Sequence, residues 1–210
     1  RAPGFDEQLK AFMDQKREIA VDVSGVVSSI IERIRTEGDT ALFDLTKELD
    51  GHVINADTIR VSQFEIEESL TLCNNETLDA LALAADRIRT FHEKQVPSRL
   101  EYTDEAGVKL GYRWSPVQAA GLYVPGGTAS YPSSVLMNAL PAKVAGVDRL
   151  AMVVPASDGT LSPYILAAAH IAGVSEIYRI GGAQAIAALA YGTDSVTPVN
   201  VIVGPGNIYV

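Results

Sequence analysis

The stretch NVIVGPGN, residues 200–207, joins a short apolar run to a glycine turn. Val201–Val203 has the β-branched composition of a buried strand, and Gly204–Gly206 can turn the chain tightly after it. A helix is expected to follow. Strand, glycine turn and helix start often form an anion or cofactor site, because backbone N–H groups and the helix dipole converge there. We therefore expect this chain to be the N-terminal part of a larger α/β enzyme, ending inside the cofactor-binding domain.

Three earlier apolar runs repeat this arrangement. We predict strands over 122–124, 150–154 and 176–180, each of which runs into glycine or proline. Two helix exits, at Gly146 and Gly173, lie 27 residues apart, which suits one βα unit. Successive βα units form a parallel sheet with right-handed crossovers and collect ligands at the carboxyl ends of the strands. The pattern predicts an incomplete Rossmann-like parallel sheet domain with helices on both faces.

The chain before this region is predicted to be mostly helical. Apolar residues from Ile19 to Ile34 recur at steps of 3 and 4, and Gly38 can close that helix. Asp39 is the expected cap of the next helix, which ends at Gly51.

Residues 59–97 carry further signals of secondary structure. Residues 59–61 are a short strand candidate, and Ser62 with Glu65 forms a capping box for the helix that follows. Asn75 is the expected cap of a longer helix that must end before Pro97.

Alternating side chains between residues 102 and 114 predict a β-hairpin with its turn at 104–107. We place a domain boundary after it. The predicted domains are a helical region with a hairpin, residues 1–115, and the Rossmann-like NAD-binding domain, residues 116–210, cut short at its C-terminal end.

Composition narrows the classes of partner. A formal net charge of −9 opposes binding to phosphate backbones, so nucleic acid is not expected as a partner. No apolar run approaches the length that spans a bilayer, and residues 1–4 lack the apolar stretch of a signal peptide. The single Cys73 fits a reducing compartment, so we expect a cytoplasmic protein without a membrane partner.

Two amides are the best candidates for ligand contacts. Gln184 lies in the first turn after Gly181 and Gly182, and Asn207 comes directly after Gly206. Both can donate and accept hydrogen bonds at a helix N-terminus that faces the strand ends. Helix capping is an equally good interpretation of Asn207. The usual dinucleotide fingerprint is absent, because Tyr209 stands where a third glycine is required.

Catalytic and metal-binding groups are not evident. His52, His92 and His170 are far apart, and none has a His or Cys partner at the spacing of a metal site. We interpret them as surface or helix histidines. Because zinc sites need three or four converging ligands, the segment is not expected to hold zinc alone.

Several motifs resemble the histidinol dehydrogenase family, in the family's order and with its spacing. They are GLYVPGGTA at 121–129, PSSVLM at 132–137, GGAQAIAALA at 181–190, VGPGN at 203–207 and, in the helical half, RTEGDTAL at 35–42. The resemblance covers essentially the whole chain and about the first half of the family's length.

The resemblance implies a zinc-dependent, NAD-linked oxidation of L-histidinol through L-histidinal to L-histidine, the last step of histidine biosynthesis. It implies that NAD is contacted by Tyr123, Gln184 and Asn207, of which Tyr123 is added by the resemblance alone. The family's zinc ligands and its Glu-His base pair correspond to sequence beyond Val210. The family works as an intertwined homodimer, so a homodimer is expected, and the segment alone is expected to be inactive and prone to association.

Two alternatives remain open at this point. A relative within the family could oxidise another small alcohol, such as a sulfonated diol, with the same cofactor half. A non-catalytic module could retain this half for binding or assembly. Residues after Val210 discriminate between these hypotheses, because the substrate pocket and the base pair are expected there.

Overall fold

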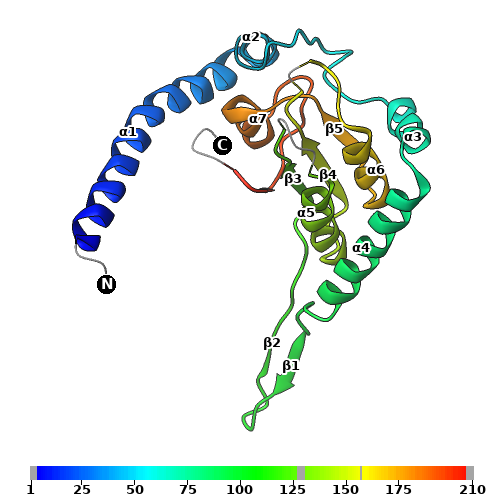
Figure 1. Cartoon of the computed structure of the whole chain (residues 1–210). Coiled ribbons are helices and arrows are strands. Elements are labelled where there is room, and N and C mark those ends of the chain that lie inside the picture. The colour runs from blue at the N-terminus through cyan, green and yellow to red at the C-terminus, as the bar shows by residue number, and fades with distance from the viewer. Residues whose placement is uncertain (1–3, 127–130, 157, 207–210) are drawn as a thin grey trace.

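The computed structural model describes residues 4–126, 131–156 and 158–206, except for the side chains of residues 11 and 14–22. In chain order the elements are α1 (Phe5–Glu37), α2 (Asp39–Asp50), α3 (Gln63–Leu72), α4 (Asn75–Glu93), β1 (Leu100–Thr103), β2 (Lys109–Tyr112), β3 (Ala119–Tyr123), α5 (Pro132–Val144), β4 (Arg149–Val153), α6 (Pro163–Ile171), β5 (Glu176–Tyr178), α7 (Gly182–Tyr191) and β6 (Val201–Val203) (Figure 1).

The centre of the fold is a parallel sheet with the strand order β5-β4-β3-β6. From β3 the chain adds β4 and β5 on one side, and α7 then carries it back to place β6 on the other side of β3. The strand order therefore reverses between β3 and β6, where a doubly wound fold opens its ligand site. The predicted parallel sheet is confirmed, and the predicted strands agree with the observed ones to within a few residues.

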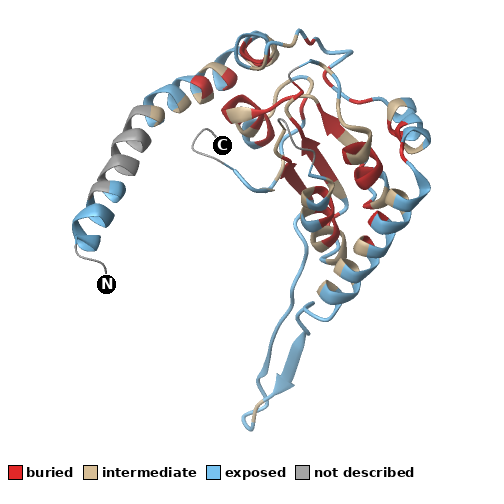
Figure 2. Ribbon diagram, in the orientation of Figure 1, coloured by how far each residue is buried: buried red, intermediate tan, exposed pale blue. Residues whose placement is uncertain are grey.

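Helices cover both faces of this sheet, as predicted. Alternate strand residues, among them Leu122 and Met152, belong to the apolar cluster beneath α3, α4, α5 and α6. The intervening residues, among them Tyr123 and Val153, face the cluster formed with α1, α2 and α7. Figure 2 shows the buried residues gathered in the sheet and on the inward sides of these helices. Burial on both faces is what a parallel sheet requires.

Several local predictions are confirmed. Ser62 Oγ accepts the backbone N–H of Glu65 at 3.2 Å, and a Glu65 carboxylate oxygen accepts the N–H of Ser62 at 2.9 Å, which completes the capping box. Gly146 and Gly173 follow α5 and α6 with φ of 88° and 74°. This left-handed conformation is the one in which glycine ends helices most easily.

Two predicted caps are wrong. The cap of α2 is Gly38, and the Asp39 carboxylate instead accepts the Ser195 hydroxyl at 2.6 Å. A tertiary partner has taken the side chain that sequence pattern assigned to the helix end. The cap of α4 is Asn74, one residue before Asn75, and its side-chain oxygen accepts the N–H of Thr77 at 2.7 Å.

The segment over residues 59–61 is a bridge rather than a full strand. Arg60 pairs with Tyr178 in an isolated antiparallel bridge, and Val61 N–H donates to the carbonyl of Ile177 at 2.8 Å. The bridge lies beside β5, at the edge of the parallel sheet. It satisfies edge groups that would otherwise be open to pairing with another chain.

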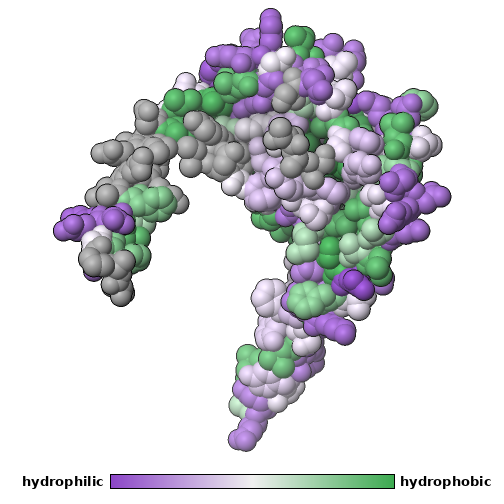
Figure 3. Space-filling view, viewed as in Figure 1, coloured by the Kyte–Doolittle hydropathy of each residue, from purple (hydrophilic) through white to green (hydrophobic). Residues whose placement is uncertain are grey.

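The predicted hairpin is confirmed as β1 and β2, and it projects away from the body. All residues of both strands are exposed. Figure 3 shows the hairpin and the N-terminal part of α1 as two arms. Both apolar clusters contain residues from before and after position 115, and the boundary predicted there stays a prediction.

Helix α2 offers a matched test of the core, because it carries one buried and one exposed leucine. Leu42 is fully buried, and Leu49 is 53% exposed. We expect Leu42→Ala to lower the free energy of unfolding by about 2 to 5 kcal/mol, since it removes buried methyl groups and leaves a cavity. Leu49→Ala should change it by less than about 0.5 kcal/mol. Urea unfolding of both variants measures the difference, and equal effects would contradict this placement of α2.

Candidate functional site

The carboxyl ends of β3 and β6 lie against each other at the point where the strand order reverses. Tyr123 is the last residue of β3, and Gly204 directly follows β6. A Cβ on Gly204 would lie 2.2 Å from the carbonyl oxygen of Tyr123, so only glycine permits this approach. The glycine turn that begins at Gly204 therefore starts at the predicted edge of the sheet.

The other glycine turns pack against a single proline. A Cβ on Gly126 would lie 2.6 Å from the carbonyl oxygen of Pro155, and a Cβ on Gly181 would lie 2.3 Å from its ring Cγ. The loops after β3, β4 and β5 are thereby held together at one edge. These glycines allow close packing of backbone, which is the structural interpretation of such turns.

Tyr123 points from the end of β3 toward the start of α7. It is 6% exposed, and its hydroxyl oxygen accepts the backbone N–H of Gly182 at 3.3 Å. The phenol can still donate its own proton, because its oxygen is the acceptor in this contact. Burial raises the pKa of Tyr123, the nearby charge of Asp50 adds to this, and the hydrogen bond from Gly182 opposes it.

Gln184 lies in the first turn of α7, as predicted, and is 1% exposed. Its Nε2 donates to Oδ2 of Asp50 at 3.2 Å. Its Oε1 is the one buried side-chain oxygen or nitrogen without a hydrogen-bond partner among the described residues. An unpaired buried acceptor costs about 1 to 3 kcal/mol, so such an atom usually marks a place where a water or a ligand binds.

Asp50 is a member of this site that the sequence did not indicate. It is the last residue of α2, and the backbone N–H of Gly181 at the start of α7 lies close enough to lower the pKa of its carboxyl. In the sequence it resembles any acidic residue on a solvated helix, and 134 positions separate it from Gln184. The nearest signal was Gly51, which fixes where α2 ends but not what its last side chain meets.

His52 also lies closer to this site than its sequence context suggested. A Cβ on Gly159 would lie 2.4 Å from the Cε1 atom of His52, so the imidazole packs against the loop after β4. Its charge interaction with Asp50 lowers the pKa of that carboxyl. The surface interpretation of His52 therefore omits its packing against this loop.

The structure brings two of the three predicted contact residues together. Tyr123 contacts the N–H of Gly182, and Gln184 Oε1 lies 2.8 Å from where a Cβ of Gly182 would be. Asn207 lies outside the described residues. Tyr123 can offer a donor and Gln184 an acceptor, which suits a neutral polar group such as an amide or a ribose hydroxyl. Their role in binding a ligand stays a prediction.

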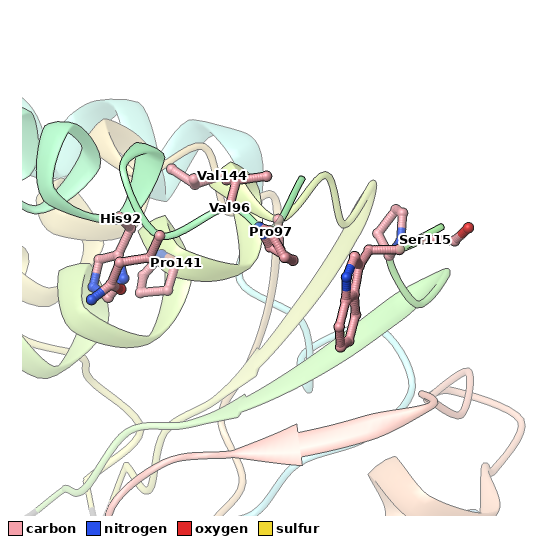
Figure 4. Close-up of a pocket in the computed structure, with 10 residues that line it drawn as sticks. His92, Val96, Pro97, Ser115, Pro141 and Val144 are labelled. Carbon is pink, nitrogen blue, oxygen red and sulfur yellow. The ribbon is translucent and has the colours of Figure 1, made fainter. Parts of the chain in front are cut away.

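A different pocket lies at the opposite edge of the sheet, before β3 begins. It has a volume of about 330 Å³ and is lined by residues 92 and 95–97, Trp114–Pro116, Pro141 and residues 144–145 (Figure 4). Proline, valine and tryptophan side chains dominate its lining. It is remote from the strand ends where Tyr123 and Gln184 meet.

The described part of the chain shows neither a metal site nor a membrane span. No three side chains among its His, Cys, Asp and Glu residues come together as a set that could hold a metal ion. None of its helices is both long enough and apolar enough to cross a membrane.

Comparison with known proteins gives consistent matches. A family model described as histidinol dehydrogenase matches residues 13–210. Histidinol dehydrogenase from Rhodopseudomonas palustris is 54% identical over 209 residues, which are 100% of this chain and 48% of that protein. Histidinol dehydrogenase from Rhodospirillum rubrum is 57% identical over 206 residues, which are 98% of this chain and 48% of that protein.

A solved structure agrees with these matches. The crystal structure of histidinol dehydrogenase from Elizabethkingia anophelis superposes with a TM-score of 0.84 at 34% identity, covering 89% of this chain and 43% of that one. The fold, together with the site that Tyr123 and Gln184 form at the strand ends (the strand-end site), defines a Rossmann-like α/β protein. The chain belongs to the histidinol dehydrogenase family, and it spans about half the length of the curated relatives it matches.

The charge on Asp50 gives the site a pH-dependent effect on stability. Burial raises the pKa of this carboxyl, against the hydrogen bonds from Gln184 and Gly181 and the charge of His52. A folded-state pKa above the unfolded value gives stability that is fully present below the unfolded pKa. That stability is lost as pH rises through the folded pKa. Ionised Asp50 therefore opposes folding at neutral pH.

We expect Asp50→Asn to raise the free energy of unfolding at neutral pH, because the amide removes the buried charge. This gain should shrink at about pH 4, near the ordinary pKa of an aspartate. Urea unfolding of both proteins at the two pH values measures the gain. A variant that is less stable than the parent at neutral pH would contradict the expectation.

Proposed function

We propose that this chain is the NAD-binding part of an enzyme that oxidises L-histidinol through L-histidinal to L-histidine, the last step of histidine biosynthesis. The observation that carries the proposal is the match to relatives named histidinol dehydrogenase over the whole of this chain. The strand-end site supports it, because a Rossmann-like sheet collects its ligand where the strand order reverses.

NAD fits the residues that converge on Gly182. Tyr123 can donate a hydrogen bond, and Gln184 has a buried oxygen that accepts none from the described residues. Asn207, after the turn that follows β6, is the third proposed contact. When bound, NAD would accept the hydride that leaves the substrate. The role of Tyr123 and Gln184 is to bind and orient the cofactor.

Zinc does not fit any group of side chains in the described part of the chain. The proposed enzyme requires zinc, and we assign its ligands and the general base to sequence beyond Val210. No step of the reaction is assigned to a residue of this chain. Its proposed contribution is cofactor binding.

The proposed assembly is a cytoplasmic homodimer. Large apolar side chains stay exposed on the hairpin arm, including Tyr112 at 52% and Trp114 at 67%. On the arm formed by α1, Phe12 is 54% exposed. Apolar side chains gathered on projecting elements are typical of surfaces that another chain covers. Light scattering of the protein at its full natural length tests the proposed dimer.

The activity is tested on the protein at its full natural length, with zinc. L-histidinol and NAD should give L-histidine with formation of NADH, which is followed by absorbance. NADH formation from a sulfonated diol and none from L-histidinol would overturn the substrate proposal. NAD binding without turnover of either alcohol would favour a non-catalytic binding module.

Replacement of Gln184 tests the cofactor site directly. Gln184→Ala should weaken NAD binding by about 1 to 2 kcal/mol, roughly 5- to 30-fold in Kd, as expected for a lost ligand hydrogen bond. Gln63→Ala is the matched control, because Gln63 is exposed on α3 and bonds Glu67 on the same helix. Isothermal titration with NAD gives both values. An affinity unchanged in Gln184→Ala would remove Gln184 from the cofactor site.

A further inference from the structure

The N-terminal end of α7 is already occupied by a carboxylate of this chain. Asp50 accepts a hydrogen bond from the side-chain Nε2 of Gln184 in the first turn of α7, and the backbone N–H of Gly181, the residue that caps α7, lowers the pKa of the same carboxyl. A helix N-terminus attracts anions through its free N–H groups and its dipole. A phosphate would find the N–H of Gly182 already bonded to the Tyr123 hydroxyl and the charge of Asp50 close by.

Asp50 also fixes which end of the Gln184 amide is presented. An ionised carboxylate only accepts hydrogen bonds, so the amide must turn its NH₂ group toward Asp50 and its oxygen away. That oxygen, Oε1, lies next to Gly182, in space that a side chain would fill: a Cβ there would be 2.8 Å away. Gly182 has a φ of 59°, a conformation that favours glycine. Glycine at 182 therefore places no side chain against Oε1, which is buried and has no hydrogen-bond partner among the described residues.

We propose that Asp50 is a positioning residue of the cofactor site: it locks Gln184 with Oε1 as an acceptor, so that this position binds a hydrogen-bond donor of NAD and not a phosphate. The inference rests on the proposed function, because it deepens the description of the same site. The donor is an N–H of the nicotinamide carboxamide or adenine, or a ribose hydroxyl, since these are the donors that NAD carries.

The identity of residue 50 supports this role. Asparagine would satisfy Gly181 N–H with its oxygen and remove a buried charge, and the raised pKa of Asp50 shows that burial opposes that charge. Asparagine would also offer an NH₂ group to Gln184, which could then turn its amide and hide Oε1. Only a carboxylate enforces one orientation. The destabilising charge is retained at the position where orientation matters.

The test uses Asp50→Asn in the protein at its full natural length, with NAD as the probe. Isothermal titration should show a Kd roughly fivefold to tenfold higher than in the parent, the size of one lost hydrogen bond. The melting temperature at neutral pH should not fall. In a Gln184→Ala background, Asp50→Asn should leave the Kd unchanged, because Asp50 acts through Gln184.

Asp39→Asn is the matched control. Asp39 begins the same helix, and its carboxylate also makes a tertiary contact, with the Ser195 hydroxyl at 2.6 Å and the Ser195 N–H at 3.2 Å. Loss of this contact should leave the Kd for NAD unchanged in both backgrounds. A rise in Kd equal to that of Asp50→Asn would show that any loosening of α2 weakens the cofactor site, and would overturn the proposal.

An analogue identifies the donor. In 3-acetylpyridine adenine dinucleotide a methyl group replaces the carboxamide NH₂. If the effect of Asp50→Asn disappears with this analogue, the donor bound by Gln184 is the carboxamide. If the effect persists, the donor is a ribose hydroxyl or the adenine amine. Either result supports an acceptor at Gln184.

The remaining outcomes separate this inference from the proposed function. If Gln184→Ala weakens NAD binding and Asp50→Asn does not, the positioning role is wrong and the cofactor site stands. If Asp50→Asn weakens binding equally with and without Gln184, Asp50 acts by another route and the inference is overturned. If neither variant changes the Kd, the proposed cofactor contact at Gln184 fails with it.

Discussion

Strand β3 carries Gly121 on the face that α7 covers, and the arrangement of the site depends on how closely these two elements pack. A Cβ on Gly121 would lie 3.0 Å from Leu189 Cδ1 of α7 and 3.1 Å from Val199 Cγ2, just before β6. A larger residue would push α7 away from β3. The close approach lets Gly182 at the start of α7 reach the hydroxyl of Tyr123. Parallel strands point their carboxyl ends to one edge, and there the hydrogen bond from Gly182 to Tyr123 joins the end of β3 to the start of α7.

Helix α2 completes the site from outside the sheet. It packs on α7, and its two ends meet different partners: Asp39 bonds Ser195 beyond the C-terminal end of α7, and Asp50 bonds Gln184 at the N-terminal end. These contacts join one end of α2 to the segment after α7 and the other end to the first turn of α7. The second contact involves an amide whose oxygen has no hydrogen-bond partner among the described residues, so in our proposal a contact between helices acts directly on the ligand site. Residues that keep an opposing charge for such a purpose lower stability, as expected where function and stability conflict.

Much of the fold could be predicted from the sequence, because its signals are local. The capping box at Ser62 and the helix ends at Gly146 and Gly173 follow from the chemistry of a few adjacent residues. The apolar runs before each glycine turn gave the strands, and short βα units left a parallel sheet as the consistent arrangement. The prediction of Asp39 as a helix cap was wrong because its carboxylate bonds a residue that is distant in the sequence, Ser195, 156 positions away. The glycines at 126 and 181 were predicted as turn residues, yet their packing against Pro155 could not be, since it depends on how the loops meet.

For the site, residue type and position after a strand were enough to select Gln184, and family resemblance added Tyr123. The pattern could not indicate that both converge on Gly182, nor that Asp50 faces them, because contacts across 134 positions depend on how α2 lies on α7. The pattern also could not give the direction of the Gln184 amide. That direction depends on the carboxylate of Asp50, whose sequence context is that of a solvated helix residue. Helices, strands and their ends depend on interactions between neighbouring residues, so the sequence determines them directly. The partners of a buried polar group come from packing, and packing is decided by the whole fold.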